Sequence, residues 1–175
     1  MIARLAAAAS CVLLAACAAL APPETPFPQL AAVPKSFEMS GRLAVREGQH
    51  SEIAQLRWIR RGASDEWIVS SPLGNEVARI ESTPHGATLT RSGDSAEQAE
   101  TFQELTHRIL GVALDPSWLA EGLHGRAPDN LPPGWRFTLD ETQPAGAVRL
   151  AKRITVSNGD TVVRLVVDSY RPLGD

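Results

Sequence analysis

The four histidines, the residues best suited to proton transfer near neutral pH, are widely spaced in this sequence. They are His50, His85, His107 and His124, and each falls in a different part of the chain. Their spacing does not match the short spacings that metal-binding histidines usually show. We therefore expect no metal site, and we interpret these histidines as surface or partly buried residues.

Short catalytic motifs are also missing from the sequence. The chain has no Gly-x-Ser-x-Gly turn, no glycine-rich phosphate loop and no His-Glu-x-x-His pair. Asp94, Glu97 and Glu100 form an acidic run, which we interpret as the solvated start of a helix, where negative charge suits the helix dipole. These observations favour a protein that is not an enzyme and that needs no cofactor.

The first residues have the pattern of a secretory signal. Arg4 is followed by an uncharged apolar run, residues 5–16, that is too short to span a bilayer. The run ends in Leu14-Ala15-Ala16-Cys17, which resembles the lipobox of bacterial lipoproteins, where the cysteine thiol receives a diacylglyceryl group. We predict a signal peptide at 1–16 and lipidation of Cys17. The alternative is an ordinary signal cleaved near Ala21, with Cys17 discarded.

The region after Cys17 is rich in proline, with Pro22, Pro23, Pro26 and Pro28 in one short stretch. Proline at this density disfavours helices and strand pairing and favours an extended spacer. We predict a lipidated cysteine and tether at 17–35 and one folded domain at 36–175. The second cysteine, Cys11, lies in the signal, so no disulfide is expected.

The composition is that of an ordinary globular domain. The chain has 175 residues, of which 43% are hydrophobic and 21% charged. Its formal net charge of −3 shows no basic excess of the kind that nucleic-acid binding requires. We therefore expect a single domain that does not bind nucleic acid.

Period-two patterns indicate strands at both ends of the domain. Apolar and polar residues alternate over 37–45, 54–58 and 135–139, and shorter strand-like runs cover 66–71, 77–80 and 87–90. Near the end, residues 148–156 and 161–170 predict a hairpin through the Asn158-Gly159 turn.

The middle of the domain changes to a helical period. Phe102, Leu105, Ile109 and Leu110 share one helix face, Gly111 is a plausible helix end, and Asp115-Pro116 predicts the start of a second helix. Strands, then helices, then strands indicate an α+β fold. We predict a curved antiparallel sheet, an open half-barrel, with the helices covering its apolar concave face. The pattern leaves open whether the interior is filled or hollow.

Several motifs in consistent order resemble the LolB family of outer-membrane lipoproteins. The first are Gly41-Arg42-Leu43-Ala44-Val45, Leu56-x-Trp58 and Pro72-Leu73-Gly74; Leu119-x-x-x-Leu123-x-Gly125, Gly134-Trp135 and Leu165-Val166-Val167-Asp168 follow. The resemblance spans most of 37–170. Three features depart from it: Gly122 and Tyr170 stand where the family usually has tryptophan, and the proline typical before the penultimate strand is not found near Arg149-Leu150.

The resemblance implies a receptor that accepts lipoproteins from the periplasmic carrier LolA. It implies an apolar cavity for the acyl chains of the cargo, and insertion of that cargo into the outer membrane. Ala18, rather than aspartate after the cysteine, fits sorting to the outer membrane, where Cys17 would anchor the protein in the inner leaflet, facing the periplasm. We expect a monomer.

The resemblance also implies that the Pro72-Leu73-Gly74 loop protrudes and delivers cargo into the membrane. A large apolar residue has little reason to occupy a turn between strands unless its side chain meets an apolar partner. The alternative is that Leu73 folds back and packs near Trp67.

For the interior we name seven residues as the acyl-cavity lining: Leu43, Leu56, Trp58, Ile109, Leu119, Leu123 and Trp135. The alternative is that the tryptophans are ordinary core residues. Two other functions compete with the receptor. One is a lipoprotein that binds another amphiphile, such as a phospholipid or a glycolipid, and the other is a structural lipoprotein of the envelope with a filled core.

Overall fold

The structure is a computed structural model that describes residues 33–145 and 148–174. The predicted signal peptide at 1–16, Cys17 and nearly all of the predicted tether therefore lie outside the described residues. The folded elements begin with a strand at Ser36, close to the predicted domain start.

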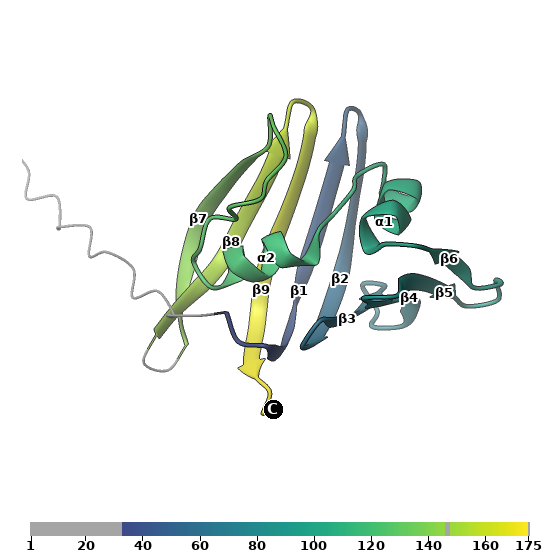
Figure 1. Cartoon of the computed structure of the whole chain (residues 1–175), viewed down its shortest axis with the longest axis horizontal. Helices are drawn as coiled ribbons and strands as arrows, with labels where there is room; N and C mark the ends of the chain where they lie inside the picture. Colours follow the sequence, from purple (N-terminus) through teal and green to yellow (C-terminus); the bar gives the residue numbers. More distant parts are fainter. Residues whose placement is uncertain (1–32, 146–147, 175) are drawn as a thin grey trace, which may run out of the picture.

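Within the described residues the chain forms one antiparallel sheet and two helices (Figure 1). The strand order is β6-β5-β4-β3-β2-β1-β9-β8-β7, so the last strand of the chain pairs with the first. The elements are β1 (Ser36–Glu47), β2 (His50–Arg61), β3 (Ser64–Ser70), β4 (Glu76–Thr83), β5 (Gly86–Arg91), β6 (Glu97–Ala99), α1 (Phe102–Leu110), α2 (Pro116–Leu123), β7 (Arg136–Ala145), β8 (Val148–Asn158) and β9 (Thr161–Pro172).

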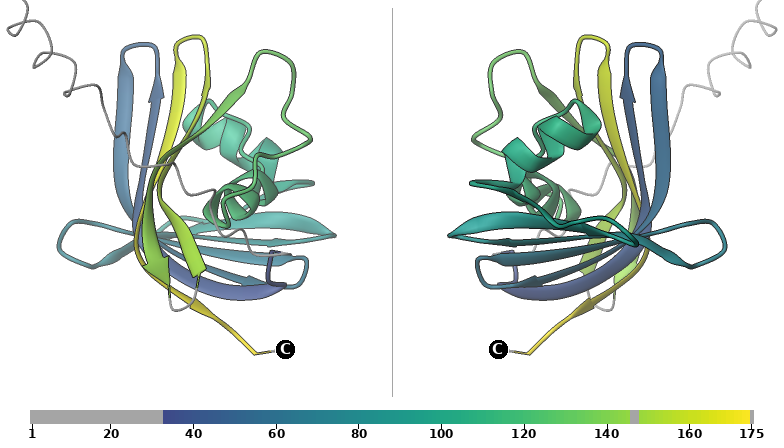
Figure 2. Two further views of the ribbon diagram at one scale, coloured as in Figure 1. Left: turned by 90° about the vertical axis from the view of Figure 1, so that its left-hand side faces the viewer. Right: turned by 90° about the vertical axis from the view of Figure 1, so that its right-hand side faces the viewer.

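The sheet is strongly curved, and both helices lie inside the curve (Figure 2). The strands β3, β4 and β5 lie across the lower part of the molecule, at a steep angle to the upper parts of β1, β2, β8 and β9. The helix α2 lies against β8, and α1 lies beside β5 and β6. The predicted α+β half-barrel with helices over its concave face is confirmed.

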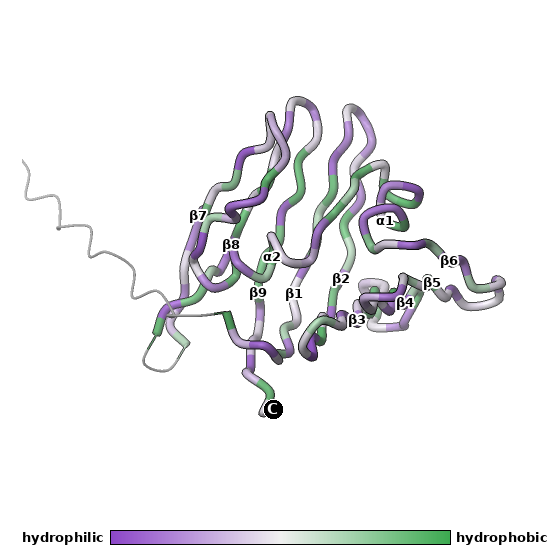
Figure 3. Tube along the Cα trace, in the orientation of Figure 1, coloured by the Kyte–Doolittle hydropathy of each residue, from purple (hydrophilic) through white to green (hydrophobic). Residues whose placement is uncertain are grey.

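The period-two pattern of the sequence sets the two faces of the sheet. In β1, Phe37, Met39, Gly41, Leu43 and Val45 are buried, while the residues that alternate with them are half-buried or exposed. Alternating apolar and polar residues are visible along the long strands (Figure 3). The predicted hairpin is present, with β8 and β9 closing through Asn158↔Thr161.

The acidic run at 94–100 does not start a helix, so that prediction was wrong. Glu97 lies in β6, pairs with Leu89 of β5 and forms an ion pair with Arg91. The helix α1 begins later because Thr101 caps it, accepting a hydrogen bond from the Glu104 amide at 3.1 Å. Period and charge alone did not separate a short edge strand from a first helical turn.

Gly41 allows the two end strands of the chain to meet. The register between β1 and β9 shifts between Ser40 and Gly41, and a Cβ at Gly41 would lie 2.1 Å from the Val166 carbonyl oxygen. Since that oxygen belongs to the backbone, it cannot move aside without breaking the ladder.

We expect Gly41→Ala to lower the free energy of unfolding by about 3 kcal/mol, at the upper end for overpacking. Urea unfolding of the two proteins measures the difference. Gly174→Ala is the control, because a Cβ there meets nothing within 4 Å. Equal stability of Gly41→Ala and the parent protein would contradict this role for Gly41.

Gly122, one of the positions that depart from the motif resemblance, lets α2 approach the sheet closely. A Cβ at this position would lie 2.5 Å from the Phe137 ring and 3.0 Å from Ile154. A tryptophan has no room here. Trp118, one turn earlier, packs instead on Trp135, with ring centroids 6.0 Å apart.

Candidate functional site: an apolar cavity beside a filled core

An apolar cavity of about 330 Å³ lies between α1 and the strands β1 to β5. This volume falls at the lower end of the range typical of ligand pockets, about 300–1,000 Å³. Leu43 and Val45 of β1, Trp67 of β3, and Ile80 and Leu89 of β4 and β5 form much of its wall. The interior is therefore partly hollow, which the sequence pattern had left open.

Polar groups in the cavity lining are few. They are the side chain of Glu52, which is exposed, that of Arg91, which pairs with Glu97, that of Thr106, and the buried indole N–H of Trp67, which has no hydrogen-bond partner within the described residues. Thr106 is fully buried, and its hydroxyl donates to the Phe102 carbonyl at 3.0 Å and accepts from the Leu114 amide at 2.9 Å. Because this hydroxyl is already paired within the protein, the lining is suited to a hydrocarbon ligand.

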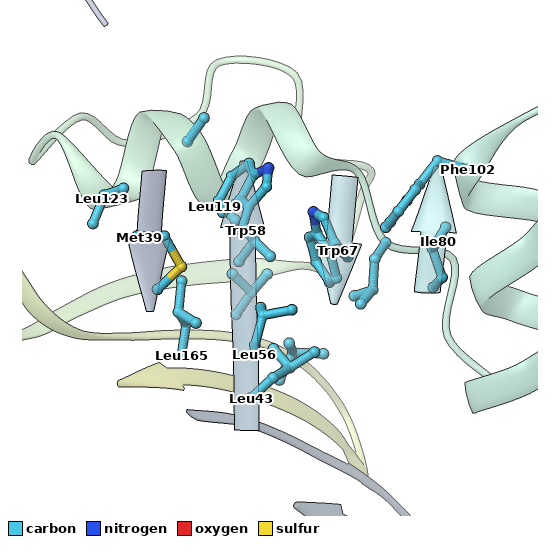
Figure 4. Packing of buried hydrophobic residues seen from close by; sticks show 14 of the residues in the cluster. Met39, Leu43, Leu56, Trp58, Trp67, Ile80, Phe102, Leu119, Leu123 and Leu165 are labelled. Carbon is cyan, nitrogen blue, oxygen red and sulfur yellow. The ribbon is translucent and has the colours of Figure 1, made fainter. Parts of the chain in front are cut away.

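The other half of the concave side, under α2, is filled by side chains (Figure 4). Phe37, Met39, Leu123, Ile154 and Leu165 are all fully buried there. Trp58 is also fully buried, and its indole N–H donates to the Asp65 carboxylate at 2.7 Å. This half of the interior is an ordinary packed core.

Of the seven residues predicted to line an acyl cavity, two lie on the cavity wall. Leu43 contributes from β1 and Ile109 from α1. Leu56, Trp58, Leu119 and Leu123 are buried core residues outside this lining, and Trp135 is half-buried against Trp118. Their contact with acyl chains stays a prediction. The sequence analysis did not predict five other residues of the cavity wall: Val45, Trp67, Val69, Ile80 and Leu89. All five are apolar residues in strands, so the period-two pattern could have indicated them.

The predicted loop Pro72-Leu73-Gly74 connects β3 and β4 and projects away from the body of the molecule (Figure 2). The Leu73 side chain is 90% exposed, so it does not fold back onto Trp67. The Ser71 amide donates to the Asn75 carbonyl and the Gly74 amide to the Ser71 carbonyl, both at 2.9 Å. Gly74 has a φ of 87°, which favours glycine. This tight turn holds Leu73 at its tip.

The loop and the cavity lie at the same end of the sheet. Val69, near the end of β3, and Val77, at the start of β4, both line the cavity, and the loop joins these two strands. Val77 is 45% exposed, which places it at the cavity mouth. The geometry therefore puts an exposed apolar loop tip close to the entrance of an apolar cavity.

A buried histidine fastens the end of α2 to β9. The Nδ1 atom of His124 lies 2.7 Å from the Ala120 carbonyl oxygen, and Nε2 lies 2.8 Å from the Tyr170 hydroxyl. Burial raises the pKa of Tyr170 to about 12, so its hydroxyl keeps its proton and donates to Nε2. Burial also lowers the pKa of His124 below its ordinary 6.5. Tyr170, the other position that departs from the motif resemblance, thus supplies a hydrogen bond to His124.

This histidine makes stability depend on pH. The folded protein binds the His124 proton less readily than the unfolded chain does, so protonation of His124 favours unfolding. The free energy of unfolding is therefore highest above pH 6.5 and falls as the pH drops below it. We expect the slope of the free energy of unfolding against pH to approach about 1.4 kcal/mol per pH unit below this value, and to be smaller in His124→Gln. Urea unfolding at several pH values checks this, and equal slopes for both proteins would contradict it.

Within 33–145 and 148–174, no three His, Cys, Asp or Glu side chains are grouped to hold a metal ion. In the same residues, neither helix has the length and apolar character needed to cross a membrane.

The sequence model of the family described as outer membrane lipoprotein LolB matches residues 35–170. The chain belongs to this family. It is 32% identical to the outer-membrane lipoprotein LolB of Azoarcus sp. (strain BH72), with 97% of each chain covered. It is 33% identical to the LolB of Thiobacillus denitrificans, with 90% of this chain and 91% of that one covered.

Among solved structures, a LolA superfamily protein from Nitrosomonas europaea superposes with a TM-score of 0.44 and 12% identity, over 85% of this chain and 88% of that one. Membership in the LolB family confirms the resemblance seen in the motifs and supports the lipoprotein-receptor function that it implies.

Proposed function

We propose that this protein receives lipoproteins from the periplasmic carrier LolA, holds their acyl chains in the cavity under α1, and inserts them into the outer membrane. The observation that carries the proposal is the pairing of the apolar cavity with the exposed Leu73 loop at the same end of the sheet. The cavity supplies an apolar holding site, and the loop supplies an apolar contact for a bilayer.

The energetics of lipid transfer explain why such a cavity is needed. Each acyl CH₂ that leaves an apolar environment for water costs about 0.8 kcal/mol, so a long chain cannot cross the periplasm exposed. Transfer from carrier to receptor to bilayer needs no nucleotide if each station binds the chains more tightly than the last. An apolar lining with few polar groups meets the requirement of the middle station.

The present cavity suits part of one acyl chain, whereas a triacylated lipoprotein carries three. We expect α1 to move outward when cargo enters, because α1 forms the wall opposite the sheet through Ile109 and Leu110. Only Phe102, Leu105 and Thr106 of this helix are buried. The filled core under α2 would remain in place.

The anchor is the second part of the proposal. The relatives are named outer-membrane lipoproteins, which supports an outer-membrane location for this chain. We place its attachment at Cys17, in the periplasm-facing leaflet, with the proline-rich residues 17–35 as a spacer before a domain at 36–175. No catalytic step is part of this function.

The test is transfer in solution. Residues 18–175 are mixed with the carrier loaded with a labelled triacylated lipoprotein, and the label is followed by size separation. We expect it to move onto this protein. No transfer to a folded sample from its matching carrier would contradict the receptor function and favour another amphiphile or a structural role, and a binding screen with phospholipid and glycolipid separates those two.

A further inference from the structure

Part of β2 has a free edge inside the sheet. The pairing of β2 with β3 covers Arg61 to Gln55, where Gln55 lies opposite Ser70, but β2 continues to His50. Among the described residues, only β1 pairs with this last part of β2. In Figure 1, β3 accompanies only the lower part of β2, whereas the end of α1, rather than a strand, lies near the upper part, with a pocket between Glu52 and Ile109.

The register identifies the backbone groups on this edge. Glu47 and His50 close a two-residue turn, so the even-numbered residues of β2 bond to β1 and the odd-numbered residues face β3. Ser51 and Ile53 therefore direct their N–H and C=O groups to the side where β3 has ended. Within the described residues, these groups make no hydrogen bond. We call residues 51–53 the β2 edge.

Proline explains why β3 stops short. The register that pairs Gln55 with Ser70 would place Pro72 opposite Ile53. Proline has no N–H to donate to that pair, and the chain turns away instead through Ser71–Asn75. The same motif that projects Leu73 therefore leaves the β2 edge unpaired.

The β2 edge borders the cavity. Glu52 and Ala54, which alternate with Ser51 and Ile53, both line it. Ile53 itself is 72% exposed on the opposite face of the strand. A chain segment covalently attached to an acyl group in the cavity would thus leave the cavity alongside unpaired backbone donors and acceptors.

The outer edges of the sheet are protected in ways that the β2 edge is not. At one end, β6 has only 3 residues. At the other, β7 has register shifts between Leu139 and Thr142 and contains Pro144. Short edges, bulges and prolines are the usual means of preventing strand addition. The β2 edge has a regular register with β1 and contains no proline.

We propose that the β2 edge binds the peptide that directly follows the acylated cysteine of the cargo, as an added strand. This rests on the proposed function, since it requires the acyl chains to occupy the cavity. Backbone pairing suits a receptor for many lipoproteins, because every sequence without proline supplies the same donors and acceptors. The protein's own tether is a poor competitor, since Pro22, Pro23, Pro26 and Pro28 interrupt its amide donors.

The test is a competition for capture from the carrier. The full-length mature protein in lipid nanodiscs is offered an equal mixture of two triacylated cysteine lipopeptides, one with ordinary amides and one N-methylated along the following peptide. We expect the ordinary lipopeptide to be captured in about tenfold excess, which corresponds to about 1.4 kcal/mol. In Ile53→Pro the excess should vanish, while Ile53→Ala, which keeps the amide, should retain it. Because the readout is the ratio of the two captured lipopeptides, it does not depend on how much of each variant is folded.

Two further readouts separate the possible failures. Capture of a triacylated cysteine without a peptide tests the cavity, and failure to capture it would overturn the proposed function. Normal capture of the lipopeptides with no preference for ordinary amides would overturn the strand addition alone. In the unaltered protein, hydrogen exchange at the Ser51 and Ile53 amides should slow on loading with lipopeptide and not with the acylated cysteine. The strand addition would also be overturned if exchange at these amides did not slow on loading. The same holds if exchange slowed without cargo as the protein concentration rose, because that would indicate pairing between two copies of the protein.

Discussion

Leu73→Glu is expected to leave uptake of lipoprotein intact and to block its insertion into membranes. Leu73 is 90% exposed at the tip of a tight turn, so its replacement removes no packing from the core. Moving a charged side chain into a bilayer in place of leucine costs about 3 kcal/mol, which corresponds to roughly a hundredfold loss of contact with the membrane. Transfer from carrier to protein, followed by transfer from protein to vesicles, measures the two steps separately.

Two control variants make this result specific to the loop tip. Leu73→Met keeps an apolar tip and should insert cargo normally. Asn75→Glu places the same charge at the base of the same turn, where the backbone pairs with Ser71, and should have a much smaller effect. If Leu73→Glu also lost uptake from the carrier, Leu73 would belong to carrier docking or cargo binding rather than to insertion.

The second large effect is expected from filling the cavity. Ala78 of β4 lines the cavity, and Ala78→Trp would occupy much of its volume of about 330 Å³ with an indole ring. We expect a folded protein whose affinity for a fluorescent fatty-acyl probe falls at least about tenfold, since an apolar ligand gains affinity from the apolar surface that it buries. Thermal unfolding checks that the fold is retained.

The matched control for cavity filling is Ala44→Trp. Ala44 lies in β1 between Leu43 and Val45, whose side chains line the cavity, so its own side chain points to the other face. The same change in volume there should leave binding of the probe unaltered. Equal affinity in both variants would show that the acyl chain binds elsewhere.

The sequence predicted the two faces of the sheet well because alternation in a strand directly reports burial. Phe37, Met39, Leu43 and Val45 are buried as their period indicates. The β8–β9 hairpin followed from Asn158-Gly159, whose backbone preference fixes a tight turn. Leu73 stood out because an isolated leucine in a Pro-x-Gly turn has no strand or helix face to join.

The division of the interior into a filled and a hollow half could not be predicted in the same way. Leu43 and Leu123 have equally apolar positions, yet one lines the cavity and the other lies in the packed core. The difference depends on where each helix sits over the sheet. The close approach of α2 is permitted by Gly122, whose contacts with Phe137 and Ile154 join residues far apart in the chain. No local pattern reports such a contact.

The most direct measurement is photo-crosslinking of a lipoprotein that carries a photoreactive group within an acyl chain. The cargo is transferred from the carrier to the protein, irradiated, and the labelled residues are mapped by mass spectrometry. Acyl chains in the cavity predict labels on its wall, at residues such as Trp67, Ile80 and Leu89, and loss of those labels in Ala78→Trp. Labels confined to the outer face of the sheet, or unaffected by Ala78→Trp, would contradict the assignment of this cavity as the holding site.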